Sequence, residues 1–215
     1  MTMSADALTQ LINWMRQHAA SANLTADSRQ VRRGDIFFAV PTAVGDGRNY
    51  IHAAIEAGAA AIVFEAGIAL DTDKAVPHFE QVNLHHHLGQ IAAAWYRHVS
   101  ADWFNVAITG TNGKTSCSQW LGKALSLLDH PCAVVGTLGS GVYKDGHLLA
   151  LQETGFTTPD ALQLHTRLDG LAVQGAKALA IEASSIGLAQ QRLQGVHFDA
   201  AVFTNLTRDH LDYHG

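Results

Sequence analysis

The stretch that decides the fold reads Asn105-Val106-Ala107-Ile108-Thr109-Gly110-Thr111-Asn112-Gly113-Lys114-Thr115-Ser116. It opens with a short apolar run rich in β-branched residues, which is typical of a buried parallel strand. Two glycines around Thr-Asn follow, and then a lysine and two hydroxyl side chains. Backbone N–H groups at a helix N-terminus face an anion, and glycine lets the backbone approach it. Strand, glycine loop and helix in this order therefore indicate a phosphate-binding loop.

Each residue type in this loop has a role in that hypothesis. Lys114 would reach the terminal phosphates of ATP, and the Thr115 hydroxyl would coordinate Mg²⁺. The strict Walker pattern is not met, because Ile108 stands where that pattern has its first glycine. An ordinary tight strand-to-helix turn is the alternative. The predicted phosphate-binding residues are Gly110, Thr111, Asn112, Gly113, Lys114, Thr115 and Ser116.

A helix is predicted directly after the loop, because apolar residues recur at helical spacing. Its expected buried positions are Cys117, Trp120, Leu121, Ala124, Leu125 and Leu128.

Composition limits the class of protein. The 215 residues are 47% hydrophobic and 15% charged, which is ample for buried α/β cores. The net charge of −5 and the lack of a basic run argue against nucleic acid as a partner. Two cysteines imply no disulfide framework and fit a reducing compartment. With no membrane-length apolar run and no signal-peptide pattern, we expect a cytoplasmic protein without a membrane partner.

The first part of the chain predicts a small α/β domain. An opening helix is marked by Ser4 and Asp6, with Leu8, Leu11, Ile12 and Met15 on its apolar face. Strands are expected at 36–40 and 60–64. Between them Asn49 is predicted to cap a helix that Gly58 ends.

A helix over residues 84–99 is predicted to connect this block to the phosphate loop. It contains His85-His86-His87, which invites a metal-site interpretation. Three consecutive residues point in different directions around a helix, so they cannot converge on one ion. We therefore predict that these histidines are solvated.

Three further strands are predicted after the loop, at 133–137, 178–181 and 200–204. Glycines 139, 141 and 146 suggest a hairpin or loop, and Thr158 with Pro159 is predicted to cap a helix that stops at Gly175. Polar clusters at 182–185 and 205–210 follow two of the strands. Carboxyl ends of parallel strands share one sheet edge, so these clusters and the phosphate loop should meet.

The motifs resemble a known family. Gly-Thr-Asn-Gly-Lys-Thr is similar to the loop of Mur ligases and folylpolyglutamate synthases, which activate a carboxylate with ATP. The ordered set Asp27-Ser28-Arg29, Gly-Asp-Ile-Phe-Phe-Ala, Asp-Gly-Arg-Asn-Tyr-Ile resembles the uridine-nucleotide domain of Mur ligases. Thr-Thr-Pro-Asp, Glu-Ala-Ser-Ser-Ile-Gly-Leu-Ala-Gln-Gln-Arg and Phe-Thr-Asn-Leu-Thr-Arg-Asp-His-Leu-Asp-Tyr-His-Gly resemble the central domain of members that add the third peptide residue.

The resemblance implies the roles of several residues. Glu182 and His210 would hold magnesium together with Thr115, and with Lys114 they form the expected catalytic set. The residues implied to contact UDP-N-acetylmuramoyl-L-Ala-D-Glu are Ala26, Ser28, Thr157, Thr158, Ser184, Gln190 and Arg192. The implied reaction is ATP-dependent formation of an acyl phosphate, which the amine of meso-diaminopimelate or lysine then attacks. Phe156 stands where some relatives have Asn, so that contact is not carried over.

The resemblance also implies an organisation. We expect an α/β chain with a uridine-nucleotide domain at 1–83 and a mostly parallel, incomplete central ATP-binding domain at 84–215. Family members continue with a carbamate-bearing lysine and a third domain, so we expect this chain to bind the UDP precursor or ATP weakly without forming the amide. We also expect a monomer. The alternatives are a folylpolyglutamate-type or dipeptide-adding ligase, or a non-catalytic nucleotide-binding fragment. The 27–29 block argues against the folate enzyme, and the 205–215 motif against the dipeptide-adding one.

Overall fold

The computed structural model describes residues 2–42, 45–67, 76–153, 155–208 and 210–215. The chain divides into two compact units, Met1–Trp95 and Tyr96–Gly215. Each unit is an α/β structure with its own sheet and core, as the sequence predicted. Among the described residues, no helix combines the length and apolar character needed to cross a membrane.

The first unit is built on a four-stranded sheet in the order β1-β2-β5-β6, and all its neighbouring strands are parallel. Its strands are β1 (Leu24–Thr25), β2 (Ile36–Ala39), β5 (Ala61–Glu65) and β6 (His78–Gln81), with a separate pair formed by β3 (Pro41–Thr42) and β4 (Gly45–Asp46). Its helices are α1 (Ala5–Ala19), α2 (Ile51–Glu56) and α3 (Leu88–Trp95), with 3₁₀ turns η1 (Ser28–Gln30), η2 (Gly47–Tyr50) and η3 (Leu84–His86).

Helix α3 belongs to this first unit. It packs on α1, where the Arg16 guanidinium lies 4.1 Å from the centre of the Trp95 ring and also donates to the Trp95 carbonyl. The Trp95 indole N–H donates to the Ala22 carbonyl at 3.0 Å. Because these contacts hold α3 against α1, the boundary between the units falls after Trp95, whereas the sequence analysis placed it after residue 83.

Several local predictions in this unit are confirmed, and others are wrong. Ser4 caps α1, as expected. The predicted cap of the second helix is wrong: Asn49 lies inside the turn η2, which Asp46 caps by accepting from the Arg48 N–H. Tyr50 holds the cap position of α2 and makes no side-chain capping bond. The helix predicted over 84–99 is a 3₁₀ turn followed by the shorter α3.

The three histidines differ from one another. The His85 ring and backbone N–H both contact the Glu65 carboxylate, at 2.9 and 3.1 Å. His87 is buried, which corrects the prediction of a solvated cluster, and burial lowers its pKa. The turn at η3 sends His87 inward, so helix-based reasoning on three successive residues did not apply there.

The second unit contains a six-stranded sheet in the order β10-β9-β8-β11-β7-β12. Its strands are β7 (Phe104–Thr109), β8 (Cys132–Gly136), β9 (Gly139–Lys144), β10 (His147–Gln152), β11 (Ala178–Glu182) and β12 (Ala200–Phe203). Its helices are α4 (Lys114–Ser126), α5 (Ala161–Val173), α6 (Ser185–Ala189) and α7 (Leu211–His214). Strands β8, β11, β7 and β12 are parallel, and β9 and β10 add an antiparallel hairpin that the glycines predicted.

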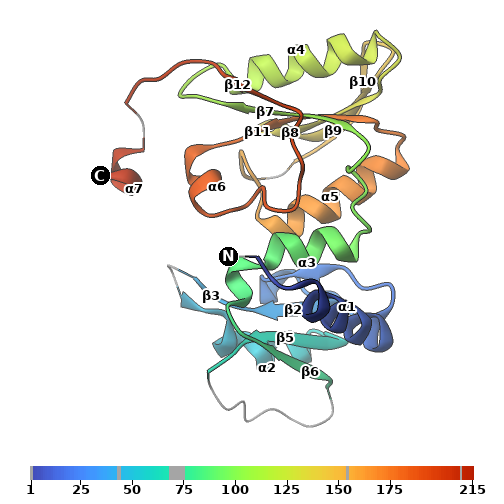
Figure 1. Cartoon of the computed structure of the whole chain (residues 1–215), viewed down its shortest axis with the longest axis vertical. Coiled ribbons are helices and arrows are strands. Elements are labelled where there is room, and N and C mark those ends of the chain that lie inside the picture. Colours follow the sequence, from blue (N-terminus) through green and yellow to red (C-terminus); the bar gives the residue numbers. More distant parts are fainter. Residues whose placement is uncertain (1, 43–44, 68–75, 154, 209) are drawn as a thin grey trace. The chain divides into compact units, whose positions relative to one another are not determined.

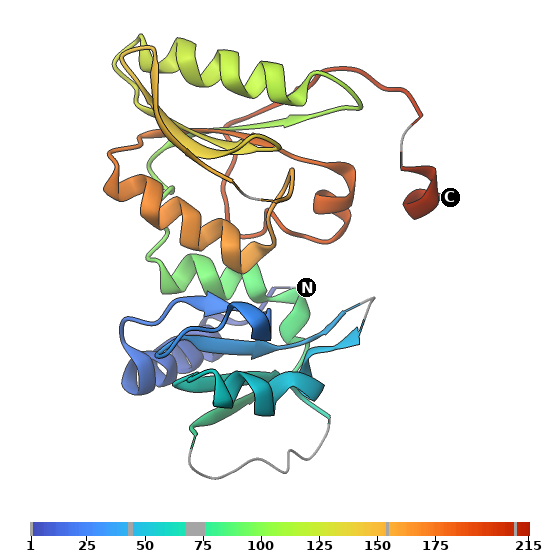
Figure 2. The same cartoon turned by 180° about the vertical axis from the view of Figure 1, so that it is seen from behind.

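Helices cover both faces of this sheet (Figure 1 and, from behind, Figure 2). Helix α4 lies on one face, over a core that includes Ile108 and Val134. Helix α5 lies on the other face, where its leucines pack with Val135 and Ile181. The parallel strands therefore end at one edge of a sandwiched sheet, which is where α/β folds bind ligands.

Helix α4 meets the sheet through small residues. Its fully buried positions are Ser118, Gly122 and Ser126. The predicted apolar face is confirmed at Cys117, Leu121 and Leu125, which pack against the core. It is wrong at Ala124, at Trp120, which is 72% exposed, and at Leu128, which is 68% exposed and lies beyond the end of the helix. A Cβ on Gly122 would lie 2.5 Å from Cγ1 of Val134. The helix approaches the sheet this closely because that side chain is missing, and Leu121 and Leu125 pack against the core on either side of the contact.

Helix α5 begins two residues later than expected. Its cap is Asp160, whose carboxylate accepts from the Gln163 N–H at 3.0 Å. Thr158, predicted as the cap, is only 1% exposed, and its hydroxyl reaches the backbone of Glu182 instead. Gly175 follows the end of the helix with a φ of +90°, as predicted.

The packing of α4 yields a first prediction. Gly122→Ala should destabilise the fold by about 1–3 kcal/mol, because the added methyl group overpacks the contact with Val134. Gly170→Ala in α5 is the matched control, since a Cβ there meets nothing within 4 Å, and it should stabilise by about 0.5–1 kcal/mol. Urea unfolding followed by circular dichroism measures both. Equal effects of the two changes would show that the close approach of α4 does not matter.

Candidate functional site

The loop predicted to bind phosphate, called the phosphate loop below, lies between β7 and α4, as the sequence indicated. Gly110 has a φ of +123° and Gly113 a φ of +86°, a region that favours glycine. Gly110 is doubly constrained, because a Cβ there would lie 2.2 Å from the Thr204 hydroxyl oxygen. Gly113 immediately precedes the first residue of α4, so the loop delivers the N-terminus of that helix to the sheet edge.

Lys114 folds back over the loop. Its ammonium donates to the carbonyl oxygens of Gly110 at 2.6 Å and Thr111 at 3.1 Å. An ammonium has three donors, so one remains for another acceptor. The lysine is thus held at the mouth of the loop by the loop itself.

The segment after β12 braces the loop from the side. The Asn205 side chain accepts from the Asn112 N–H at 3.0 Å and donates to the Asn112 carbonyl at 2.9 Å. The Thr204 hydroxyl donates to the same carbonyl at 2.7 Å. Next to it, the Thr111 side chain exchanges hydrogen bonds with the backbone of Thr207. Residues 204–207 therefore hold the shape of the loop.

Glu182 lies at the end of β11 and is only 1% exposed. Its Oε2 accepts from the Thr115 hydroxyl at 3.0 Å. Two predicted magnesium ligands that are far apart in sequence are thereby in contact. The contact occurs because β11 is the parallel neighbour of β7.

Thr137, which the sequence analysis did not assign to the site, also contacts Glu182. Its backbone N–H donates to Oε1 at 3.0 Å, and its hydroxyl donates to Oε2 at 3.1 Å. The residue before it, Gly136, leaves the space for the carboxylate, since a Cβ there would lie 2.0 Å from Oε1. The only signal in the sequence was position: Thr137 directly follows a strand whose parallel neighbour ends in Glu182.

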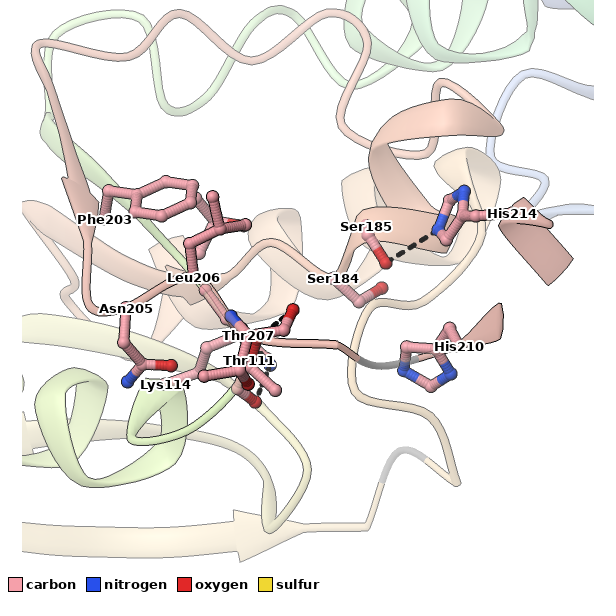
Figure 3. Close-up of a pocket in the computed structure, with 12 residues that line it drawn as sticks. Thr111, Lys114, Ser184, Ser185, Phe203, Asn205, Leu206, Thr207, His210 and His214 are labelled. Carbon is pink, nitrogen blue, oxygen red and sulfur yellow. Dashed lines mark hydrogen bonds between the residues drawn. The ribbon is translucent and has the colours of Figure 1, made fainter. Parts of the chain in front are cut away.

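A pocket of about 250 Å³ opens beside the loop (Figure 3). It brings the three predicted clusters together, and its lining residues are Thr109, Gly110, Thr111, Lys114, Ser184, Ser185, Phe203, Asn205, Leu206, Thr207, His210 and His214. The His214 ring contacts the Ser185 hydroxyl at 2.9 Å. The expectation that these sheet-edge segments meet is confirmed.

His210 is placed differently from the other two predicted metal ligands. It lines the pocket, and Figure 3 shows it on the other side of the view from Lys114. Thr115 and Glu182 are not among the described lining residues of that pocket. The structure therefore pairs Thr115 with Glu182, and it places His210 on the wall of the adjoining pocket.

The predicted precursor-binding residues of the second unit form one connected set. The Arg192 guanidinium donates to the Thr158 carbonyl at 2.7 Å and to the Gln190 side chain at 2.7 and 3.0 Å. The Thr158 hydroxyl contacts the Ser184 hydroxyl at 3.0 Å, and Thr157 contacts Thr137 at 3.0 Å. Thr158 is buried and supports its neighbours, whereas Arg192 and Gln190 are reachable from solvent.

Asp160 adds a negative group beside this set. Burial raises the pKa of its carboxyl, and two effects oppose that rise: the N–H groups of the first turn of α5, and the charges of Arg192 and Arg167. The carboxylate thus caps the helix and faces the arginine side of the site.

In the first unit, Ser28 opens the turn η1. The Asp27 carboxylate caps that turn and pairs with the Arg29 guanidinium at 2.8 Å, a hydrogen-bonded contact that lowers the pKa of Asp27. Ala26 and Ser28 are half-buried, with the Asp27 N–H held by the Thr25 hydroxyl at 3.1 Å. The 27–29 segment is therefore a fixed turn.

Comparison with known proteins agrees with this geometry. Residues 108–215 match the Mur ligase middle domain, and residues 21–96 match the Mur ligase family catalytic domain.

The chain belongs to the Mur ligase family.

Several family members resemble the whole chain. A UDP-N-acetylmuramoyl-L-alanyl-D-glutamate–2,6-diaminopimelate ligase of Janthinobacterium sp. (strain Marseille) is 52% identical over 99% of this chain and 42% of its own length. The enzyme of the same name from Ralstonia nicotianae is 47% identical over 98% of this chain and 41% of its own length. The chain thus spans about two fifths of these curated relatives.

Solved structures give the same result. A structure with that ligase name has a TM-score of 0.71 and 35% identity, covering 90% of this chain and 38% of its own. MurF ligase from Thermotoga maritima, in complex with ADP, has a TM-score of 0.57 over 86% of this Mur ligase chain and 38% of its own. At 23% identity, that second likeness shows the fold alone.

The loop brace yields a second prediction. Asn205→Ala should speed amide hydrogen exchange at Asn112 about fivefold to tenfold, because a hydrogen bond worth about 1 kcal/mol is lost there. Asn112→Ala is the matched control, since the brace uses only the backbone of that residue. Mass spectrometry of the loop peptide measures the rates. Equal amide exchange rates of the loop peptide in the two variants would show that the Asn205 side chain does not brace the loop.

Proposed function

We propose that this chain is part of an ATP-dependent ligase of peptidoglycan precursor synthesis. It would join 2,6-diaminopimelate to UDP-N-acetylmuramoyl-L-Ala-D-Glu through an acyl phosphate. The observation that carries the proposal is a phosphate loop whose Thr115 contacts the buried Glu182, in a chain 52% identical to a ligase with that printed name. We favour diaminopimelate over lysine because the relatives above carry it in their names.

The donor atoms at Thr115 and Glu182 fit Mg²⁺. Both supply hard oxygens, which Mg²⁺ prefers, and they lie 3.0 Å apart at the base of the loop. Donating its proton to the carboxylate leaves lone pairs on the Thr115 oxygen for an ion. His210 is the proposed third ligand, supplied from the pocket wall. When bound, Mg²⁺ would neutralise charge on the nucleotide phosphates.

In the proposed reaction the precursor carboxylate attacks the γ-phosphoryl group of ATP. Lys114 and the loop N–H groups would stabilise the negative charge that develops there. The amine of the amino acid then attacks the acyl phosphate, so a C–N bond forms while the C–O bond breaks and inorganic phosphate leaves. This sequence uses no covalent intermediate on the protein. The protein therefore acts by positioning and charge stabilisation.

Each unit offers groups suited to part of the precursor. Arg192 and Gln190 offer a guanidinium and an amide beside Thr157 and Ser184, a set suited to phosphate and sugar oxygens. In the first unit Ser28 and the backbone near Ala26 are the proposed contacts to the UDP moiety. Since these ligands are soluble nucleotide precursors, we propose a cytoplasmic protein with small-molecule partners. We further propose that it is monomeric.

Lys114→Ala tests nucleotide binding. It should weaken binding of ATP with Mg²⁺ about tenfold or more, because a charged donor to phosphate is lost. Lys123→Ala removes the same charge from the last turn of the same helix and should leave the affinity unchanged. Titration calorimetry on the 215-residue chain measures both, with thermal unfolding as a check. Loss of cooperative unfolding in Lys114→Ala would mean that the residue is structural.

Arg192→Ala tests the precursor site. Affinity for the UDP precursor should fall about tenfold, as expected for a charged hydrogen-bond donor. Lys177→Ala is the charge control, because Lys177 is exposed just before β11, at the opposite ends of the strands. Unchanged affinity in Arg192→Ala would contradict the assignment. A wild-type chain that binds ATP but not the precursor would favour a nucleotide-binding fragment without ligase function.

A further inference from the structure

Thr137 lies between two parts of the proposed site. Its hydroxyl is 3.1 Å from Oε2 of Glu182 and 3.0 Å from the Thr157 hydroxyl, and its N–H is 3.0 Å from Oε1 of Glu182. With Thr115, three donor groups converge on one carboxylate that is 1% exposed. No other described side chain links Glu182 to Thr157 in this way.

Counting protons fixes the direction of these hydrogen bonds. A carboxylate only accepts, and each threonine hydroxyl has a single proton to donate. Thr137 and Thr115 therefore both donate to Oε2 of Glu182, and Thr157 donates to Thr137. The Thr137 hydroxyl thus accepts a hydrogen bond from Thr157 and donates its own proton to Oε2 of Glu182.

We propose that Thr137 is a positioning residue that holds the Glu182 carboxylate in the orientation needed to coordinate Mg²⁺ with the nucleotide. The inference rests on the proposed function, in which Glu182 is a metal ligand. The contacts of Thr137 are with Glu182 and Thr157, so in this role it would act without being a ligand of the ion. It acts through Glu182, whose two oxygens it holds with one backbone and one side-chain donor.

The surrounding backbone supports this role. Gly136 leaves room for the carboxylate where any Cβ would collide with it, so Gly136 and Thr137 together form a cradle at the end of β8. A glutamate side chain has three rotatable bonds, and ordering it before the ion arrives lowers the entropy lost on binding. Without the Thr137 hydroxyl, Oε2 retains only Thr115, which must also face the ion.

The test compares nucleotide binding with and without metal. Thr137→Val keeps the shape of the side chain and removes the hydroxyl, whereas Thr137→Ser keeps the hydroxyl. Thr166→Val is the matched control, because the Thr166 hydroxyl contacts Tyr96 and the Leu162 carbonyl, away from the site. Calorimetry measures ATP binding to the 215-residue chain with excess Mg²⁺ and with EDTA, and thermal unfolding confirms that each variant is folded.

Thr137→Val should weaken ATP binding about tenfold with Mg²⁺, as expected for a hydrogen bond to a charged group, and less than about twofold with EDTA. Thr137→Ser should bind within about threefold of wild type, and Thr166→Val should be unchanged in both conditions. An equal loss with and without Mg²⁺, or no loss, would overturn the inference. If wild-type binding itself does not depend on Mg²⁺, the metal role of Glu182 in the proposed function fails as well.

Discussion

The burial of the Glu182 carboxylate is the constraint on which the site depends. A carboxylate removed from water is costly unless its oxygens accept hydrogen bonds, so the fold must bring donors to it. Those donors come from the loop after β8 and from the first turn of α4, which are far apart in sequence. Meeting that need fixes the end of β8 against the end of β11 and the start of α4. Because the phosphate loop leads directly into α4, fixing the start of α4 also fixes the end of this loop.

The strand order allows Glu182 to meet these donors, and the Asn205 side chain holds the phosphate loop from the opposite side. Because β11 lies between β8 and β7, Glu182 can reach donors that follow both neighbours. On the other side of β7, β12 delivers Asn205, whose amide pairs with both backbone groups of Asn112. The loop is thus held from two sides by side chains of neighbouring strand ends. Such paired support keeps a binding loop close to its working shape before any ligand arrives.

Much of the fold and of the candidate site could be predicted from sequence, because strands, glycine loops and helices leave local and periodic patterns in the sequence. The phosphate loop and the meeting of strand ends followed from them. Trp120 and Leu128 were misplaced, because helical periodicity cannot show that Gly122 lets the sheet approach a face of small residues. The helix cap was assigned to Thr158 and is Asp160, because both residue types are good caps in sequence. Only the fold shows that the Thr158 hydroxyl is buried against the Glu182 backbone. Thr137 was missed since one hydroxyl after a strand carries no signal without its three-dimensional neighbour.

The position of Lys114 suits the anion-binding role proposed for the loop. Two of its three ammonium donors already bind carbonyl oxygens of the loop, at Gly110 and Thr111. A phosphate oxygen can accept the third donor without displacing either, so little side-chain freedom is lost when it binds. The carbonyls also compensate the charge while no ligand is present. Lysine at this position therefore has two effects: it donates to the carbonyl oxygens of Gly110 and Thr111, and it places a positive charge beside the loop. A neutral side chain would remove both.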